Sequence, residues 1–182
     1  MKTTFYMVRH GQPDWGWAET MRFFGPCSAY MPLTPLGVEQ IEHTACDPQL
    51  RGAAFILASP YTRTMQSAQI LSRRLDLPVT VEWDLHEWLY DRNMKGDLPT
   101  PEERFGREDM TRCFFFYMEH DELTGEDNCE TAAVIAERVL ACLRCYDGQA
   151  EKIIVVCHEG VIRSVTGMKA VNLGQVVPVT LE

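Results

Sequence analysis

Uninterrupted runs of apolar residues alternate along this chain of 182 residues with segments of helical spacing. Strands that are buried on both faces of a sheet have such uninterrupted runs. Strands of a parallel sheet are therefore predicted at residues 4–8, 54–58, 79–81 and 153–157. A fifth strand is expected over residues 176–181, where Pro178 restricts it to an edge because proline cannot donate a ladder hydrogen bond.

Predicted helix starts are marked by a capping hydroxyl followed by proline, at Thr34-Pro35, Ser59-Pro60 and Thr100-Pro101. Glu103 stands three residues after Thr100, which is a capping-box pattern. Another helix is predicted over residues 128–146, before the stop signal Asp147-Gly148. The alternation of strands and helices predicts an α/β layered fold, and the length fits a single domain over residues 1–182.

A cluster of aromatic residues, FFFY at 114–117, lies within a further apolar segment at residues 111–119. Helical spacing places Phe114 and Met118 on one face of this segment. Core packing or a subunit contact is the preferred interpretation, rather than a cofactor-binding role. The segment is therefore compatible with a homodimer.

The charge balance argues against two classes of partner. The chain has 17 Lys and Arg against 26 Asp and Glu, which is a formal net charge of −9. Neither nucleic acid nor an anionic membrane surface is therefore expected as a partner. An anionic substrate would have to be attracted by a few focused arginines. No apolar run is long enough for a signal peptide or a membrane span.

Seven cysteines are present, including one CxxC pair, Cys142 and Cys145, and they do not form a four-residue cluster of metal-ligand spacing. An odd number of cysteines without an export signal favours reduced thiols and a cytoplasmic location. Neither a metal site nor a cofactor is expected, because metal sites need clustered ligands.

Polar residues that can carry chemistry follow the predicted strands. They are Arg9-His10-Gly11 after the first strand, Arg63 shortly after the second, and His158-Glu159-Gly160 after the strand at 153–157. Ligands of open α/β sheets bind outside the carboxyl ends of the parallel strands. His10 and His158 are therefore expected to share one crevice. Arg63, in the first turn of a helix, suits an anionic ligand at that helix end.

The chain resembles the histidine phosphatase superfamily, also called the phosphoglycerate mutase-like family, in six ordered segments. They are VRHGQPDW at 8–15, LTPLGVEQ at 33–40, LASPYTRTMQSAQIL at 57–71, DLHEW at 84–88, GED at 125–127 and VVCHEGVIRSVTG at 155–167. This ordered series covers nearly the whole chain and is much more specific than any one of its members. The resemblance implies a three-layer α/β/α sandwich with a mostly parallel central sheet and a helical insertion at roughly residues 97–125.

The resemblance also implies roles for five residues. His10 would be the nucleophile, attacking phosphorus through a neutral imidazole to form a phosphohistidine. Arg9, Arg63 and His158 would surround the transferring phosphoryl oxygens, because phosphoryl transfer chiefly requires positioning and charge neutralisation. Glu87, at the family's L-x-E position, would protonate the leaving alcohol and later activate water, which needs a carboxyl with a raised pKa.

The chain departs from the family pattern next to these residues. Gly16 replaces an asparagine that commonly lies six residues after the nucleophile, and Glu159 stands where the family favours small residues. A carboxylate there would repel a dianion unless it points away or binds another part of the substrate. The candidate substrate-binding residues are Gln12, Trp15 and Glu159, and packing of the loop is the alternative role for the tryptophan.

The predicted function is that of a metal-independent phosphatase acting on a small phosphorylated metabolite, of which an α-ribazole phosphatase is one specialisation. A phosphoglycerate mutase-type phosphotransferase is the enzymatic alternative, although mutases of this family have longer inserted segments than this short chain offers. A non-catalytic phosphate-binding or interaction domain is the alternative from another class.

Overall fold

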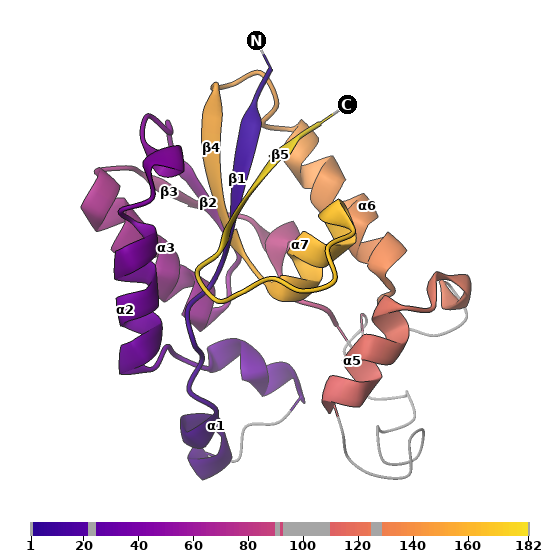
Figure 1. Cartoon of the computed structure of the whole chain (residues 1–182). Helices are drawn as coiled ribbons and strands as arrows, with labels where there is room; N and C mark the ends of the chain where they lie inside the picture. Colours follow the sequence, from indigo (N-terminus) through magenta and orange to yellow (C-terminus); the bar gives the residue numbers. More distant parts are fainter. Residues whose placement is uncertain (1, 22–24, 90–91, 93–109, 125–128, 182) are drawn as a thin grey trace.

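The structure is a computed structural model that describes residues 2–21, 25–89, 92, 110–124 and 129–181. Its strands form one sheet in the order β3-β2-β4-β1-β5. They are β1 (Thr4–Arg9), β2 (Ile56–Ala58), β3 (Val79–Val81), β4 (Lys152–Cys157) and β5 (Val176–Thr180). The pairs among β1 to β4 are parallel, and β5 runs antiparallel to β1 at the sheet edge, as Pro178 predicts (Figure 1).

Helices cover both faces of this sheet. The described helices are α1 (Trp15–Met21), α2 (Pro35–Thr44), α3 (Thr62–Leu75), α5 (Met110–Met118), α6 (Ala132–Arg144) and α7 (Glu159–Thr166). Short 3₁₀ segments are η1 (Gly25–Tyr30), η2 (Pro48–Leu50), η3 (Trp83–Leu85) and η4 (Asp121–Leu123). α2 and α3 lie on one side of the sheet and α6 and α7 on the other (Figure 1). The three-layer α/β/α prediction is confirmed.

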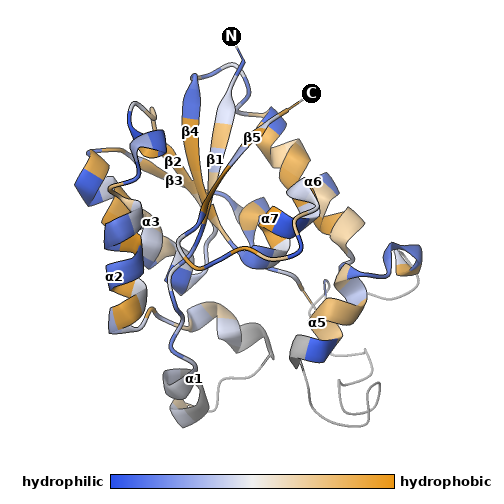
Figure 2. Ribbon diagram, in the orientation of Figure 1, coloured by the Kyte–Doolittle hydropathy of each residue, from blue (hydrophilic) through white to orange (hydrophobic). Residues whose placement is uncertain are grey.

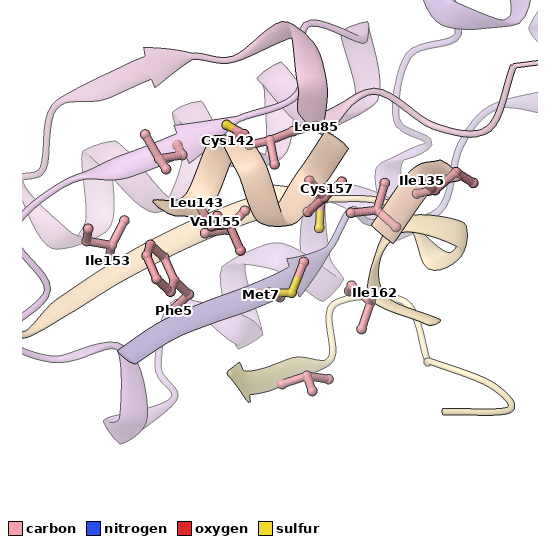
Figure 3. Packing of buried hydrophobic residues seen from close by; sticks show 14 of the residues in the cluster. Phe5, Met7, Leu85, Ile135, Cys142, Leu143, Ile153, Val155, Cys157 and Ile162 are labelled. Atoms are coloured by element: carbon pink, nitrogen blue, oxygen red, sulfur yellow. The ribbon is translucent and has the colours of Figure 1, made fainter. Parts of the chain in front are cut away.

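The sheet separates two clusters of buried apolar side chains. Phe5 and Met7 of β1 and Val155 of β4 face α6 and α7 (Figure 3). The adjacent residues Val8 and Val156 point the other way and pack with residues of α2 and α3. Successive side chains of a strand point to opposite faces, so a strand that is covered on both sides needs an apolar residue at nearly every position. Figure 2 shows these hydrophobic strands in the middle of the molecule.

The predicted start of α2 is confirmed. Thr34 is the N-cap residue, its hydroxyl oxygen accepts a hydrogen bond from the Gly37 N–H at 3.0 Å, and Pro35 is the first helical residue. The same pattern at Thr100-Pro101 lies outside the described residues.

The prediction that Ser59-Pro60 begins a helix is wrong. α3 begins three residues after Ser59, at Thr62, and the side chain of its N-cap residue Tyr61 makes no capping hydrogen bond. Ser59 is fully buried, and its hydroxyl bonds to the ring of His158 instead of a helix end. A local capping pattern cannot reveal this long-range partner.

The other predicted elements differ at their ends. α6 is shorter than the helix predicted over residues 128–146, and β2 covers only the last part of the run at 54–58. Within α5, Phe114 and Met118 both pack on the cluster beneath α6 and α7, which confirms their shared face. The GED segment at 125–127 and much of the insertion expected at roughly 97–125 lie outside the described residues. Among the described helices, none is long and apolar enough to cross a bilayer.

Candidate active site

Three neighbouring strands deliver polar side chains to the same edge of the sheet. β4 lies between β1 and β2, and because all three are parallel their carboxyl ends meet. Arg9 is the last residue of β1, Ser59 follows β2, and His158 follows β4. In Figure 1 this edge faces α1 and α5. The structure thus brings together residues that are far apart in the sequence.

His10 is 4% exposed, and two hydrogen bonds hold its ring. Nδ1 lies 2.7 Å from the carbonyl oxygen of Gly11, and because a carbonyl only accepts, Nδ1 carries the proton. Nε2 therefore has the lone pair, and it accepts a hydrogen bond from Nε of Arg63 at 3.1 Å. The fixed tautomer leaves Nε2 as the nitrogen that can act as a nucleophile.

Gly11 lies so close to α2 that no larger residue fits. A Cβ atom at this position would collide with the backbone carbonyl of Gly37, in the first turn of α2. The N–H of Gly11 donates to the hydroxyl of Ser67, on α3, at 3.3 Å. The backbone that follows His10 is therefore held between two helices, and this fixes the carbonyl that orients the imidazole.

Arg63 joins the two histidines from the first turn of α3, where it is 7% exposed. Besides donating to His10, it places Nη2 3.2 Å from Nδ1 of His158 and donates from Nη1 to the carbonyl of Ser28 at 3.0 Å. The ring of Tyr61 lies against the guanidinium, with Cζ of Arg63 5.0 Å from the ring centroid. All three nitrogens are engaged, so the orientation of the guanidinium is fixed.

His158 is fully buried, and its ring tautomer also follows from its partners. Arg63 can only donate, so Nδ1 of His158 accepts from Nη2 and Nε2 carries the proton. That proton is donated to the Ser59 hydroxyl, 2.8 Å away. The rings of His158 and His10 lie edge to face with their centroids 5.2 Å apart. The two histidines therefore share one site, as the sequence predicts.

Glu87 reaches this site from the segment that follows η3. Its carboxyl oxygens accept hydrogen bonds from the N–H of Trp88 at 3.0 Å and from the N–H of Gly160 at 3.4 Å. Gly160 is two residues after His158, so the carboxyl lies at the start of α7. A Cβ atom on Gly160 would collide with the Glu87 carboxyl, which shows how closely the two segments approach.

Arg9 is bound to the carboxylate of Glu159. Nη1 of Arg9 lies 2.9 Å from Oε2 of Glu159 and donates to the carbonyl of Val171 at 2.5 Å. The other carboxylate oxygen lies 4.0 Å from Nη1 of Arg163, one helical turn further along α7. Glu159 therefore points toward the arginines, and it neutralises part of the positive charge at the site.

Burial determines the proton affinities of these groups. Burial, and then the charge of Arg63, hold the pKa of His10 well below its usual value, and the same two causes lower the pKa of His158. Burial raises the pKa of the Glu87 carboxyl, against the opposing effect of Arg63. The site therefore favours two neutral imidazoles beside a carboxyl that retains its proton more readily than an exposed one.

Two of the predicted substrate-binding residues are occupied or exposed in other ways. The side-chain oxygen of Gln12 accepts a hydrogen bond from the Thr34 hydroxyl at 2.8 Å, at the cap of α2. Trp15 is 62% exposed at the start of α1, and Gly16 beside it is also exposed. These positions give no direct support for a role of Gln12 or Trp15 in substrate binding.

Ser59 and Tyr61 belong to the site, although they are not among the site residues predicted from the sequence. Ser59 accepts the Nε2 proton of His158, and the Tyr61 ring lies edge to face with that histidine at a centroid distance of 5.1 Å. Their position after β2 was the available signal, because they fall at the same sheet edge as His10. Over the described part of the chain, no group of three or more His, Cys, Asp or Glu residues could hold a metal ion.

Comparison with known proteins relates this geometry to one family. Residues 5–172 match the sequence profile of the Histidine phosphatase superfamily (branch 1). A segment of 82 residues, 45% of the chain, is 33% identical to the probable phosphoglycerate mutase GpmB of Proteus mirabilis (strain HI4320). That segment corresponds to 36% of the length of the mutase.

Two solved structures have a similar fold. A mycobacterial glucosyl-3-phosphoglycerate phosphatase superposes with a TM-score of 0.70 at 18% identity, covering 98% of this chain and 90% of that one. A putative alpha-ribazole-5'-P phosphatase from Escherichia coli str. K-12 substr. MG1655 gives a TM-score of 0.65 at 19% identity, covering 99% and 91%. At these identities the likeness shows the fold alone.

Proposed function

The chain belongs to the histidine phosphatase superfamily, and from this membership we propose that it is a metal-independent phosphatase of small phosphomonoesters. The observation that carries the proposal is the tautomer of His10. Its Nδ1 proton is committed to the Gly11 carbonyl, and its Nε2 lone pair faces the guanidinium of Arg63. A nucleophile beside a fixed cation is the arrangement that phosphoryl transfer requires.

The first step is attack of His10 Nε2 on phosphorus, for which the Arg63 Nε–H must leave the Nε2 lone pair and donate to a phosphoryl oxygen instead. The N–P bond forms while the bond from phosphorus to the ester oxygen breaks, and the leaving alcohol takes the proton of the Glu87 carboxyl. Arg9, Arg63 and His158 surround the phosphoryl oxygens; the two guanidiniums neutralise their charge, whereas the imidazole of His158 is neutral. The raised pKa of Glu87 supports this role, because the acid must hold its proton before the reaction.

The second step releases phosphate. The Glu87 carboxylate takes a proton from water, and the resulting hydroxide oxygen attacks phosphorus while the N–P bond breaks. The electron pair returns to Nε2, and Glu87 is again protonated, so the site is ready for another cycle. The cationic groups on the protein itself perform the charge neutralisation that a metal supplies in other phosphatases.

The position of Glu159 favours a substrate without a second anionic group near Arg9. Its carboxylate lies on the Arg9 guanidinium, so an additional negative group there would meet repulsion rather than an unoccupied cation. This supports hydrolysis of a phosphate ester whose alcohol part is uncharged or hydroxyl-rich, over phosphoglycerate isomerisation. An α-ribazole phosphate-type ester is one such substrate.

The test is turnover of a phosphomonoester panel by purified protein in EDTA. We expect release of inorganic phosphate and a phosphoprotein whose label is lost in acid but kept in alkali, as a phosphohistidine requires. A His10→Ala variant should lose both, whereas a variant of the exposed His43, His43→Ala, should keep them. Absence of turnover across the panel would reject the phosphatase and favour a domain that only binds phosphate.

A mutase is the second candidate, because the matched relative from Proteus mirabilis is named a probable phosphoglycerate mutase. Its test is conversion of 3-phosphoglycerate to 2-phosphoglycerate with dependence on a bisphosphate primer. Isomerisation faster than phosphate release would favour the mutase over the hydrolase.

A further inference from the structure

The segment that carries Glu87, which we term the strap (residues 82–89), has little regular structure of its own. Its start is tied to the end of β2 by a hydrogen bond from the Glu82 N–H to the Ala58 carbonyl at 2.9 Å. Beyond η3 the strap runs without helix or strand assignment to Leu89. Some other part of the molecule must therefore hold the backbone on either side of Glu87.

Arg138, on α6, provides one such support. Its Nη1 donates to the carbonyl of Asp84 at 2.5 Å, and its Nη2 donates to the carbonyl of His86 at 3.0 Å. The side chain is 14% exposed; its bond to His86 is partly buried, and its bond to Asp84 lies at the surface. One guanidinium thus binds the strap at two carbonyls immediately before Glu87.

Glu130 supports the strap from the other side. Its Oε2 accepts from the Leu89 N–H at 2.9 Å, and its backbone carbonyl accepts from Nε1 of Trp88 at 2.7 Å. Its backbone N–H also donates to the Leu89 carbonyl at 3.0 Å. Glu130 therefore binds the two strap residues that immediately follow Glu87.

Glu130 and Arg138 bind each other at the same time. Oε1 lies 2.7 Å from Nε, and Oε2 lies 3.0 Å from Nη2, so the contact is a two-pronged carboxylate–guanidinium pair. The Glu130 side chain is 3% exposed. A buried ion pair is weak evidence for a gain in stability, because the desolvation of both charges offsets their attraction. Geometric control of the strap is the better explanation for keeping the pair.

The Glu87 carboxyl makes few strong contacts of its own. Its two accepted hydrogen bonds come from backbone N–H groups, one of them at 3.4 Å. A protonated carboxyl accepts such bonds less strongly than a carboxylate does. The place of the carboxyl must then depend mainly on the backbone from which it projects.

We propose that Glu130 and Arg138 are a positioning pair that holds the strap so that the Glu87 carboxyl meets the leaving-group oxygen. This inference rests on the proposed function, in which Glu87 is the general acid. Neither residue touches the substrate or the reacting atoms. Their effect is transmitted through the strap carbonyls and the Leu89 N–H.

The test compares two phosphate esters that differ in how much they need an acid. p-Nitrophenyl phosphate has a leaving group that departs readily as an anion, whereas glycerol phosphate has an alkyl leaving group that must be protonated. The quantity measured is kcat/KM for each ester, which reports the step in which the ester bond breaks. The ratio of the two values from one sample is independent of the folded fraction.

Glu130→Gln and Arg138→Gln should each lower kcat/KM for glycerol phosphate about tenfold more than for p-nitrophenyl phosphate, a part of the roughly 10²–10⁴-fold contribution of a positioned general acid. The change in this ratio for Glu87→Gln measures the complete loss of the general acid, against which the other variants are compared. Each single variant leaves one buried charge without its partner, which can prevent folding. A double variant, Glu130→Leu with Arg138→Met, removes both charges and avoids this problem. It too should show the changed ratio.

Matched controls lie on the same helix, at positions with exposed side chains. Glu137→Gln and Arg144→Gln should leave both kcat/KM values unchanged. Folded variants of Glu130 and Arg138 with the wild-type ratio, beside a Glu87→Gln protein with a changed one, would overturn the positioning role and leave the proposed function intact. If Glu87→Gln also keeps the ratio, or the wild-type protein hydrolyses neither these esters nor any other of the panel, the proposed function with Glu87 as the acid fails, and with it this inference.

Discussion

The carboxylate of Glu159 is paired with the guanidinium of Arg9, with Oε2 2.9 Å from Nη1. The pair places a negative charge beside an arginine that we propose to contact the phosphoryl oxygens. A phosphate group that approaches Arg9 must therefore compete with this carboxylate. The pair is partly open to solvent, with each side chain 22% exposed, so the competition is expected to be modest.

Replacement of Glu159 by glutamine should strengthen phosphate binding. Glu159→Gln keeps the shape of the side chain and removes its charge, which frees the Arg9 guanidinium. Inorganic phosphate should then inhibit at about threefold to fivefold lower concentration, because a partly exposed ion pair contributes roughly 0.2–1 kcal/mol. The measurement is the competitive inhibition constant, with the exposed Glu151→Gln as control. Weaker inhibition in Glu159→Gln would instead mean that the carboxylate orients Arg9 for binding.

Removal of the Ser59 hydroxyl should disturb His158. Ser59→Ala leaves the buried Nε2 proton of His158 without the acceptor now 2.8 Å away. The loss of a buried hydrogen bond costs roughly 1–3 kcal/mol, which predicts a decrease in kcat/KM of about tenfold or more. Ser72→Ala, which removes a comparable bond to the Leu77 carbonyl at the far end of α3, should change thermal stability but not kcat/KM. Equal kinetics in the two variants would contradict a role for Ser59 in the site.

A methyl group on Gly160 should displace the Glu87 carboxyl. The Cβ atom of alanine at this position meets the carboxyl and lies 3.0 Å from Cε2 of Phe114. Gly160→Ala should lower kcat/KM for glycerol phosphate about 100-fold, since a displacement near 1 Å can cost that much. Inhibition by inorganic phosphate should stay near the wild-type value, because the Arg63 clamp is untouched. A parallel loss of phosphate binding and melting temperature would indicate general disruption instead.

The rate should fall on both sides of a pH optimum that is set by His10 and Glu87. His10 must be neutral to attack, and its pKa lies below the ordinary 6.5, so the rate falls only when the pH drops below that lowered value. Glu87 must be protonated to act as the acid, and its pKa is raised above 4.5, so the rate falls as the pH rises through that raised value.

Profiles of kcat/KM against pH for the wild-type protein and Glu87→Gln separate these two groups. The variant should lose the fall on the alkaline side and keep the fall on the acidic side. If the alkaline fall persists in Glu87→Gln, another group must supply the proton.

Much of the fold could be predicted from local pattern. Continuous apolar runs identify β1 and β4 because both faces of each strand are covered, and Thr34-Pro35 identifies the start of α2. These signals depend on neighbouring residues alone. The same reasoning failed at Ser59-Pro60, where an identical pattern precedes α3 but the hydroxyl is taken by His158 from another strand end. Propensity is a weak signal that tertiary contacts override.

The sequence by itself determined which chemical groups this protein has and at which strand ends they occur. Arg9-His10-Gly11 and His158 fall after β1 and β4, and parallel strands bring their carboxyl ends together. Only the tertiary structure decided the pairings between these groups. It placed Glu159 on Arg9, Ser59 on His158, and the Glu130–Arg138 pair on the strap. Such contacts join side chains whose approach depends on how whole helices pack against the sheet, and no local spacing encodes that distance.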